Sequence, residues 1–174
     1  MGKPAWIIMS NSRIGRLRYI AYTLGFGLIC APGLLGGDML TAHGYTTSGM
    51  VLTLIVQVIS SALNIMLAVR RLHDFNARGW WAILEIPYDL FDPHQMARSW
   101  PDDFRIALPI TLVILGILLI IYVLALVFRP GTFGPNRFGT PSPPNSLGVI
   151  MAATAGITLA VIVCIFSAFA SSWH

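Results

Sequence analysis

The chain has 174 residues, of which 56% are hydrophobic and only 10% are charged, and its mean hydropathy is +0.74. This composition excludes an ordinary water-soluble domain and indicates an integral membrane protein. Each span needs roughly 20 apolar residues, so we expect one all-α bundle of four to five transmembrane helices. The net charge of +4 does not indicate nucleic-acid binding, because the basic residues flank apolar segments and no groove-reading motif is present.

The first apolar segment, 17–35, follows Arg13, Arg16 and Arg18 and is interrupted by Pro32 and several glycines. A removable signal peptide would also combine a basic approach with an apolar run. The basic cluster, however, lies well inside the chain, and no clean small-x-small cleavage site follows it. These features favour a retained first span.

The second apolar segment, 50–69, ends abruptly at Arg70 and Arg71. Arginines replace apolar side chains where the hydrocarbon ends, and the following Trp80 and Trp81 are residues that prefer headgroup depth. The stretch 63–81 therefore marks a membrane exit.

Polar side chains on this second segment recur at i, i+4, i+7, i+8 and i+11, which places them on one helical face. They are Thr53, Gln57, Ser60, Ser61 and Asn64. We expect this stripe to point away from lipid and to form interhelical hydrogen bonds worth about 0.6 to 2 kcal/mol each. A polar path for a solute is the alternative.

Residues 79–105 permit two topologies. Segment 79–92 is apolar enough to enter a membrane but contains Glu85, Pro87 and Asp89, so it is a short kinked span or an interfacial or re-entrant segment. Charge bias does not decide, because either topology places nine of the 11 Lys and Arg residues inside and two outside.

Two later segments, 106–128 and 147–170, contain no charged residue and are long enough to cross about 30 Å of hydrocarbon. The last one carries small residues at every fourth position, a pattern that permits close helix approach within the chain or to another subunit. These residues are Gly148, Ala152, Gly156 and Ala160.

Four motifs together resemble the DUF805 family of small bacterial inner-membrane proteins. They are RIGRLRY at 13–19, RRLHD at 70–74, GWW at 79–81 and PGTFGPNRFG at 130–139. The resemblance covers roughly 13–141 and implies a four-helix bundle in which RRLHD and NRFG lie on the same, cytoplasmic side. It thereby favours a crossing by 79–92, and it implies no established activity.

The chain departs from the family pattern at several places. Arg18 and Ile20 stand where an acid and a tryptophan are common, and Asn76 replaces a usual glycine. We expect a family-like core over 1–146 with an inserted loop at about 88–105, followed by an additional C-terminal transmembrane helix over 147–174.

The neighbouring His73 and Asp74 suggest catalysis, since a carboxylate can set the tautomer and basicity of an imidazole. Consecutive helical residues diverge by about 100°, however, and no Ser or Cys nucleophile is tied to this pair by a motif. We therefore expect no catalytic residues and no enzymatic activity. Asp74 is expected to form an ion pair with one of five arginines: Arg13, Arg16, Arg70, Arg78 or Arg137.

Metal and cofactor sites are not indicated. His43, His94 and His174 are scattered, and Cys30 and Cys164 fall in apolar segments as packing residues. The glycines of 131–139 lack the strand, helix and Lys-Ser/Thr context of a phosphate loop and form a turn-rich connector.

The candidate binding surface is an arginine-rich rim with neighbouring aromatic and polar residues. Its members are Arg13, Arg16, Arg70, Arg71, His73, Asp74, Arg78, Trp80, Trp81, Asn136 and Arg137. Candidate helix-packing residues are Gln57, Ser61, Asn64, Gly148, Ala152, Gly156 and Ala160. Guanidinium groups match phosphate geometry, so the rim is expected to bind anionic phospholipid, with Arg16, Arg70, Arg71 and Arg137 as ligands.

The function that follows is a non-enzymatic scaffold or accessory subunit of the inner membrane, which engages lipid headgroups, a membrane-protein partner or a second copy. One alternative is a transporter for a small solute, built on the polar stripe and Glu85. Another is an enzyme that acts on lipid through His73, Asp74 and Glu85.

Overall fold

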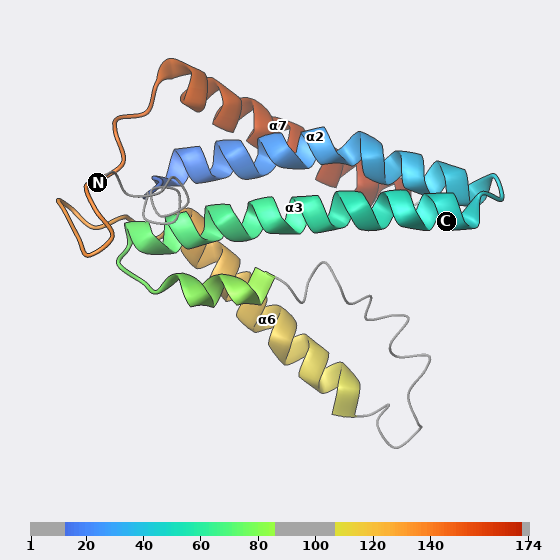
Figure 1. The fold of residues 1–174 in the computed structure, drawn as a ribbon, viewed down its shortest axis with the longest axis horizontal. Helices are drawn as coiled ribbons and strands as arrows, with labels where there is room; N and C mark the ends of the chain where they lie inside the picture. The colour runs from blue at the N-terminus through green and yellow to red at the C-terminus, as the bar shows by residue number, and fades with distance from the viewer. Residues whose placement is uncertain (1–12, 86–106, 172–174) are drawn as a thin grey trace, which may run out of the picture. The chain divides into compact units, whose positions relative to one another are not determined.

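The structure is a computed structural model that describes residues 13–85 and 107–171. Its described part is helical, with α2 (Arg16–Ala42), α3 (Thr46–Asp74), the 3-10 helix η1 (Gly79–Glu85), α6 (Ala107–Phe128) and α7 (Leu147–Ser171) (Figure 1). The last two helices match the predicted segments to within one residue at each end. The proposed inserted loop at 88–105 lies outside the described residues.

Two of these helices, α2 and α3, are long and apolar enough to cross a membrane. Val113–Phe128 of α6 and Leu147–Val163 of α7 are shorter apolar helices among the described residues. The interruption expected at Pro32 does not occur, because α2, which has 27 residues in all, continues through it to Ala42. The second segment is also longer than predicted, since α3 does not end at the arginine pair but continues through Asp74.

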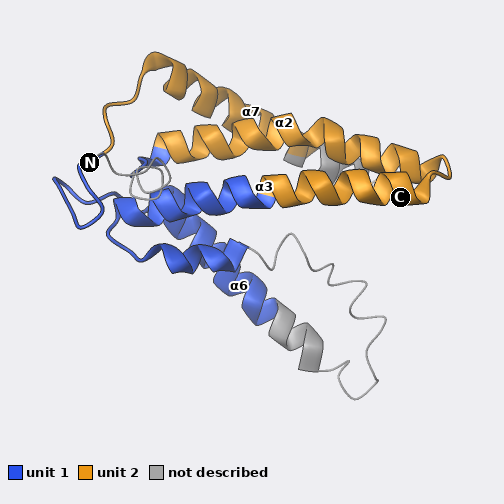
Figure 2. Cartoon of the chain, in the orientation of Figure 1, with its two compact units in different colours: residues 1–16, 61–141 blue, residues 17–60, 142–174 orange. Residues whose placement is uncertain are grey.

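The chain forms two compact units (Figure 2). Unit 1 consists of Met1–Arg16 and Ser61–Pro141, and unit 2 of Leu17–Ser60 and Ser142–His174. Helix α3 contributes to both, with its first half in unit 2 and its second half in unit 1.

Unit 2 contains a helical hairpin in which small residues let α2 and the first half of α3 approach closely. A Cβ atom added to Gly37 would lie 3.1 Å from the carbonyl oxygen of Gly49, and one added to Gly33 would lie 2.7 Å from Cγ2 of Val56. The hairpin turns at Gly44, whose φ of 89° is in the left-handed region. The turn therefore requires little strain at this position.

The polar stripe of α3 faces away from the exposed surface, as its spacing predicted. Thr53, Gln57, Ser60, Ser61 and Asn64 are all half-buried. The intervening Leu54, Ile55 and Val58 are 55%, 51% and 55% exposed. The helix therefore separates a polar inward face from an apolar outward face.

In unit 1, α3 ends in a paired hydrogen-bond motif at Asn76. The Asn76 amide donates to the His73 carbonyl at 3.2 Å, and the Ala77 amide donates to the Leu72 carbonyl at 2.9 Å. Asn76 has a φ of 61°, the left-handed conformation that such a helix end requires and that glycine adopts most readily. Asparagine at this position therefore adopts a conformation that glycine would adopt at lower cost.

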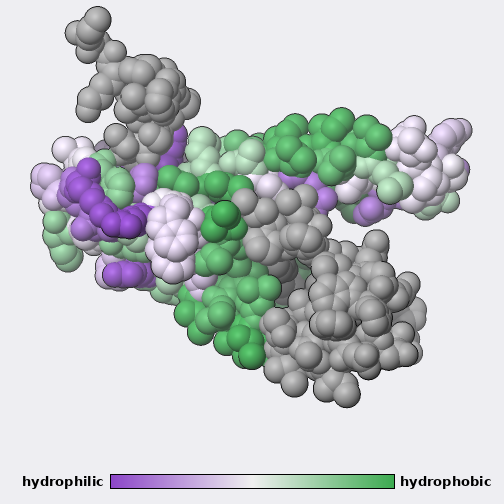
Figure 3. Space-filling model, turned by 60° about the horizontal axis from the view of Figure 1, so that its bottom comes forward, coloured by the Kyte–Doolittle hydropathy of each residue, from purple (hydrophilic) through white to green (hydrophobic). Residues whose placement is uncertain are grey.

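Unit 1 also separates polar from apolar surface. Figure 3 shows hydrophilic residues gathered at one end of the unit and hydrophobic residues over its helices. On α6, Val113, Leu118 and Ile120 are each 57% to 61% exposed. The hydrophilic end is where α3 and α6 both finish, and it contains the buried polar residues described next.

Candidate functional site

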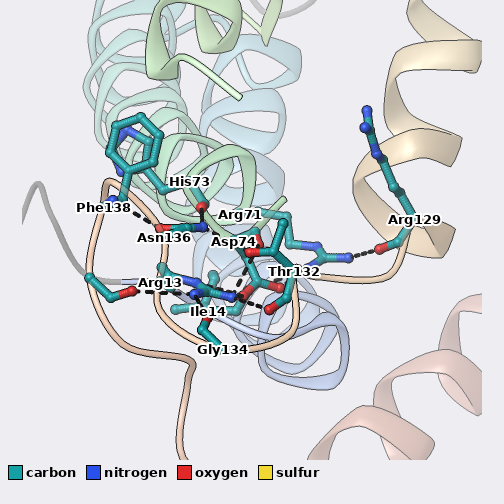
Figure 4. Close-up of polar contacts among 11 residues, drawn as sticks. Arg13, Ile14, Arg71, His73, Asp74, Arg129, Thr132, Gly134, Asn136 and Phe138 are labelled. Atoms are coloured by element: carbon teal, nitrogen blue, oxygen red, sulfur yellow. Dashed lines mark hydrogen bonds and ion pairs between the residues drawn. The ribbon is translucent and has the colours of Figure 1, made fainter. Parts of the chain in front are cut away.

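The centre of the hydrophilic end is the carboxylate of Asp74, the last residue of α3, which is only 4% exposed. Its Oδ1 accepts from Nε of Arg13 at 3.2 Å and lies 3.1 Å from Nη2 of the same guanidinium, and its Oδ2 accepts from Nη1 of Arg71 at 2.5 Å. Figure 4 shows both guanidinium groups converging on this carboxylate. Two buried cations therefore share one buried anion.

Arg13 joins the start of the chain to the loop that follows α6. Besides Asp74 Oδ1, it donates to the carbonyl oxygens of Thr132 at 2.7 Å, Gly134 at 2.8 Å, Gly139 at 3.3 Å and Asp74 at 3.2 Å. These bonds engage all five N–H groups of the guanidinium. Its side chain is 1% exposed, so Arg13 has no donor left for a ligand.

Arg71 joins α3 to the end of α6. Its Nε donates to the Leu126 carbonyl at 2.7 Å, and its Nη2 donates to the Arg129 carbonyl. The last carbonyls of a helix lack intrahelical partners and carry partial negative charge, so they favour a cation. These carbonyl oxygens therefore add negative electrostatic potential around Arg71. They are needed because the single charge of Asp74 is shared by two guanidinium groups.

The loop from Arg129 to Gly139 closes over the carboxylate. A Cβ atom added to Gly131 would lie 2.7 Å from Cγ of Asp74, which leaves space for glycine only. The Thr132 amide and hydroxyl both donate to the Asp74 carbonyl, at 2.9 and 3.1 Å. Asn136 donates through Nδ2 to the His73 carbonyl and to Thr132 Oγ1, both at 2.9 Å.

Aromatic contacts complete this end of the unit. The His73 ring stacks on Phe138 with centroids 3.8 Å apart and an interplanar angle of 10°. Arg137 lies 4.6 Å from the centroid of the same phenylalanine and donates to the Asn76 carbonyl at 2.8 Å. Arg129 lies 4.8 Å from the centroid of Phe75.

The structure divides the predicted rim into a buried and an exposed set. Arg13, Arg71, His73 and Asp74 are buried, whereas Arg70 and Asn136 are half-buried. The exposed set comprises Arg16, Arg78, Trp80, Trp81 and Arg137. The prediction that Arg71 is a lipid ligand is therefore wrong, because its guanidinium is fully buried and bonded to protein oxygens.

Asp74 pairs with Arg13, one of the partners that the sequence predicted, and with Arg71, which was not among them. RRLHD and NRFG also lie together, because Asn136 bonds the His73 carbonyl. Sequence reasoning missed Gly131, Thr132 and Gly134 as individual contributors. The only sequence signal for them was their place in the family-like motif. A backbone carbonyl is present in every residue, so its role as an acceptor cannot be recognised from residue type.

The small-residue face of α7 is occupied only in part within unit 2. A Cβ atom added to Gly156 would lie 2.9 Å from Leu24 of α2, so this glycine serves a contact inside the chain. Gly148 and Ala152 are exposed, and Ala160 is half-buried.

Among the residues that the structure describes, no group of three or more His, Cys, Asp or Glu side chains is placed to hold a metal ion. The cluster is instead a network of guanidinium, carboxylate and backbone groups. Such a network joins segments that lie far apart in sequence.

Residues 7–140, which include every member of this network, match the family described as "Protein of unknown function (DUF805)". The chain belongs to the DUF805 family. No curated protein and no solved structure matches it. The matched region ends just before the connector to α7 and includes both RRLHD and NRFG, which are joined by the hydrogen bond from Asn136 to the His73 carbonyl.

Proposed function

We propose that this DUF805 chain is a bacterial inner-membrane protein in which α2, α3, α6 and α7 each cross the bilayer. The helices have 27, 29, 22 and 25 residues. At about 1.5 Å per residue, each is longer than the roughly 30 Å of hydrocarbon. Many of their aliphatic side chains are half or more exposed, as lipid contact requires.

The cytoplasmic side of this arrangement is the end that holds Asp74. Arg71 binds the final carbonyls of α6, so α3 and α6 finish at the same end of unit 1. The chain must then return to the opposite end before α6 begins, which supports a crossing that starts in η1. Of the proposed span 79–92, only the part up to Glu85 is described. Basic residues concentrate at the Asp74 end, and this bias favours the cytoplasm.

At this end we propose a binding surface for anionic phospholipid headgroups, formed by the exposed arginines. These are Arg16, Arg78, Arg129 and Arg137. Trp80 and Trp81 are 56% and 45% exposed and stack on each other at 4.1 Å, consistent with headgroup depth. Each exposed arginine near an anionic surface contributes about 1 kcal/mol to binding.

One observation favours a scaffold or accessory subunit over an enzyme. The carboxylate that could serve as an acid or base is held by two buried arginines and covered by Gly131. The surface around it presents cations and aromatic rings, which suit binding. We therefore propose a non-enzymatic protein that engages lipid and, through its membrane surfaces, a protein partner or a second copy.

Native mass spectrometry of the full-length protein, extracted from native membranes, tests the lipid surface. The double variant Arg16→Lys and Arg137→Lys keeps the charge but removes the fork geometry of guanidinium. We expect it to retain less phosphatidylglycerol and cardiolipin than the wild type. The matched control is Arg18→Lys, because Arg18 is half-buried and donates to the Pro144 carbonyl. Equal lipid retention in all three proteins would leave the exposed arginines with a role in orientation only.

A further inference from the structure

Phe133 lies in the loop that covers the Asp74 carboxylate, and its side chain is 101% exposed. The other phenylalanine of this loop, Phe138, is half-buried and stacks on the His73 ring. One aromatic ring of the loop therefore packs within unit 1. The described residues of the unit leave the other ring uncovered.

The backbone on both sides of Phe133 is held in place. Arg13 donates to the Thr132 carbonyl at 2.7 Å and to the Gly134 carbonyl at 2.8 Å (Figure 4). Thr132 is also bonded to the Asp74 carbonyl through its amide and its hydroxyl. Gly134 has a φ of 76°, a left-handed conformation that glycine adopts with little strain. The loop therefore holds the ring outward before any partner binds, which lowers the entropy lost on binding.

Phe133 starts from nearly the same level along α3 as the exposed tryptophan pair of η1. The amide of the residue before it bonds the Asp74 carbonyl at 2.9 Å. A Cβ atom added to Gly79, the residue before the tryptophans, would lie 3.0 Å from Nε2 of His73 and 2.9 Å from Cγ1 of Val69. These three α3 residues lie within about 7.5 Å along the helix axis. One headgroup layer is about 5 to 8 Å thick, so the ring and the tryptophans start in the same layer.

The charge around this ring matches an anionic lipid surface. Among the described residues of unit 1, every exposed charged side chain is an arginine, whereas Asp74 is buried and Glu85 is half-buried. Arg129 and Arg137 are both exposed, and they stand four positions before and four positions after Phe133. Apolar rings beside basic residues are typical of segments that lie in the membrane interface. The shared level with the tryptophans favours the bilayer over a water-soluble acidic partner.

We propose that Phe133 is a membrane anchor, whose ring enters the boundary between headgroups and acyl chains of the cytoplasmic leaflet. Arg129 and Arg137 contact lipid phosphates beside it. This inference rests on the proposed function and adds an apolar contact to the proposed lipid surface. The anchor would fix the distance between the Asp74 network and the hydrocarbon.

Spin labels on single cysteines test the depth of the ring in full-length protein, in nanodiscs of phosphatidylcholine and phosphatidylglycerol. The labelled variants are Phe133→Cys, Trp80→Cys and, as a control on an exposed polar residue of the same connector, Thr140→Cys, with Cys30 and Cys164 replaced. Label collisions with oxygen, which concentrates in the bilayer, are compared with collisions with a nickel chelate, which stays in water. The ratio of the two rates should be similar at 133 and 80, and several-fold lower at 140.

Phe133→Trp repeats the measurement with an aromatic ring in place of the label. Because the position is fully exposed, this substitution leaves the packing of unit 1 unchanged. The wild type has five tryptophans, so its fluorescence is subtracted from that of the variant. The added fluorescence should be quenched by lipids brominated near the headgroup and protected from aqueous iodide. Quenching by iodide alone would overturn the proposal.

The pattern of label depths separates the anchor from the proposed function. A lipid-like ratio at 80 with a water-like ratio at 133 would overturn the anchor alone and leave the ring for a water-soluble partner. Water-like ratios at both positions would contradict the headgroup depth of the tryptophans and with it the proposed lipid surface. Labelling of Thr140→Cys from outside sealed cells would contradict the proposed cytoplasmic end.

Discussion

The Asp74 end of unit 1 and the helical hairpin of unit 2 hold helices together in different ways. At the Asp74 end, charged side chains bridge positions 61 and 119 residues apart in sequence, from Arg13 to Asp74 and to Thr132. In the hairpin, α2 and α3 are joined by a short turn, and Gly33, Gly37 and Gly49 let their backbones approach. The first arrangement depends on specific partners, and the second on the absence of side-chain volume.

The two regions differ because different interactions are available to hold helices together inside a membrane and at its boundary. Lipid tails are as apolar as leucine, so helices inside a membrane gain little from hydrophobic burial against each other and rely on close packing. At a membrane boundary, charged groups can be recruited, but once buried they must be fully paired. The thermal stability of the two regions should therefore respond differently when a charged partner is removed and when a methyl group is added.

The largest effect is expected for Asp74→Asn, which leaves Arg13 and Arg71 buried without their anion. Removing one partner of a buried ion pair typically costs about 3 to 5 kcal/mol. The variant should accumulate poorly or lose thermal stability strongly in detergent, as measured by fluorescence-detected size-exclusion chromatography after heating. His73→Gln should cost less, because the ring contributes a stacking contact with Phe138.

Asp38→Asn is the matched control for that experiment, since Asp38 is an exposed acidic residue of α2. It should leave thermal stability close to that of the wild type. If Asp74→Asn were as stable as this control but abolished a cellular phenotype, Asp74 would have a functional role and the comparison between the two regions would fail.

An intermediate effect is expected for Gly131→Ala, whose new methyl group would overlap the Asp74 carboxylate. Overpacking of this kind costs about 1 to 3 kcal/mol. Gly37→Ala in the hairpin introduces a similar overlap, but the helix preference of alanine offsets roughly 1 kcal/mol of it. We therefore expect a larger drop in melting temperature for Gly131→Ala than for Gly37→Ala.

The controls are Gly116→Ala and Gly27→Ala, since an added Cβ meets nothing within 4 Å at either position. Both should be neutral or slightly stabilising in the same melting experiment. A lower melting temperature in either control would mean that these helix surfaces have neighbours beyond the described contacts. The expected order of Gly131→Ala and Gly37→Ala would then have no basis.

The smallest effect is expected for Asn76→Gly, which relieves an asparagine held at a φ of 61°. The gain should be about a few tenths of a kcal/mol, because asparagine tolerates this conformation better than other side chains. Gly44→Asn makes the reverse exchange at the hairpin turn and should lower the melting temperature by a similar amount. Changes in melting temperature of opposite sign for the two variants would confirm that backbone conformation determines the residue preference at both turns.

Much of the helical content followed from the sequence, because long apolar runs without charge have few other stable conformations. The ends of α2 and α3 did not follow. Pro32 removes one backbone donor but leaves α2 continuous, and α3 continues past Arg70 and Arg71 to Asp74. Charge indicates where hydrocarbon ends, but it does not indicate where helical hydrogen bonding ends.

The candidate site was predictable only in part. The need of Asp74 for a cation followed from the cost of an unpaired carboxylate at a membrane boundary. Arg70 and Arg71 precede Asp74 by four and three positions, however, so helical spacing allows either to reach it. Only the packing of Arg71 against the end of α6 shows which arginine is buried beside the carboxylate. Its other partners, the Leu126 and Arg129 carbonyls, are backbone groups that any residue would provide.

The contact between Arg71 and the end of α6 has a consequence for biosynthesis. Arg71 is synthesised 55 residues before Leu126, whose carbonyl it binds. Arg13 and Asp74 likewise leave the ribosome before Thr132 and Gly134 exist. A nascent chain that has not yet delivered α6 and the loop after it thus has two arginines that lack part of their carbonyl acceptors, and the arrival of these segments completes their coordination.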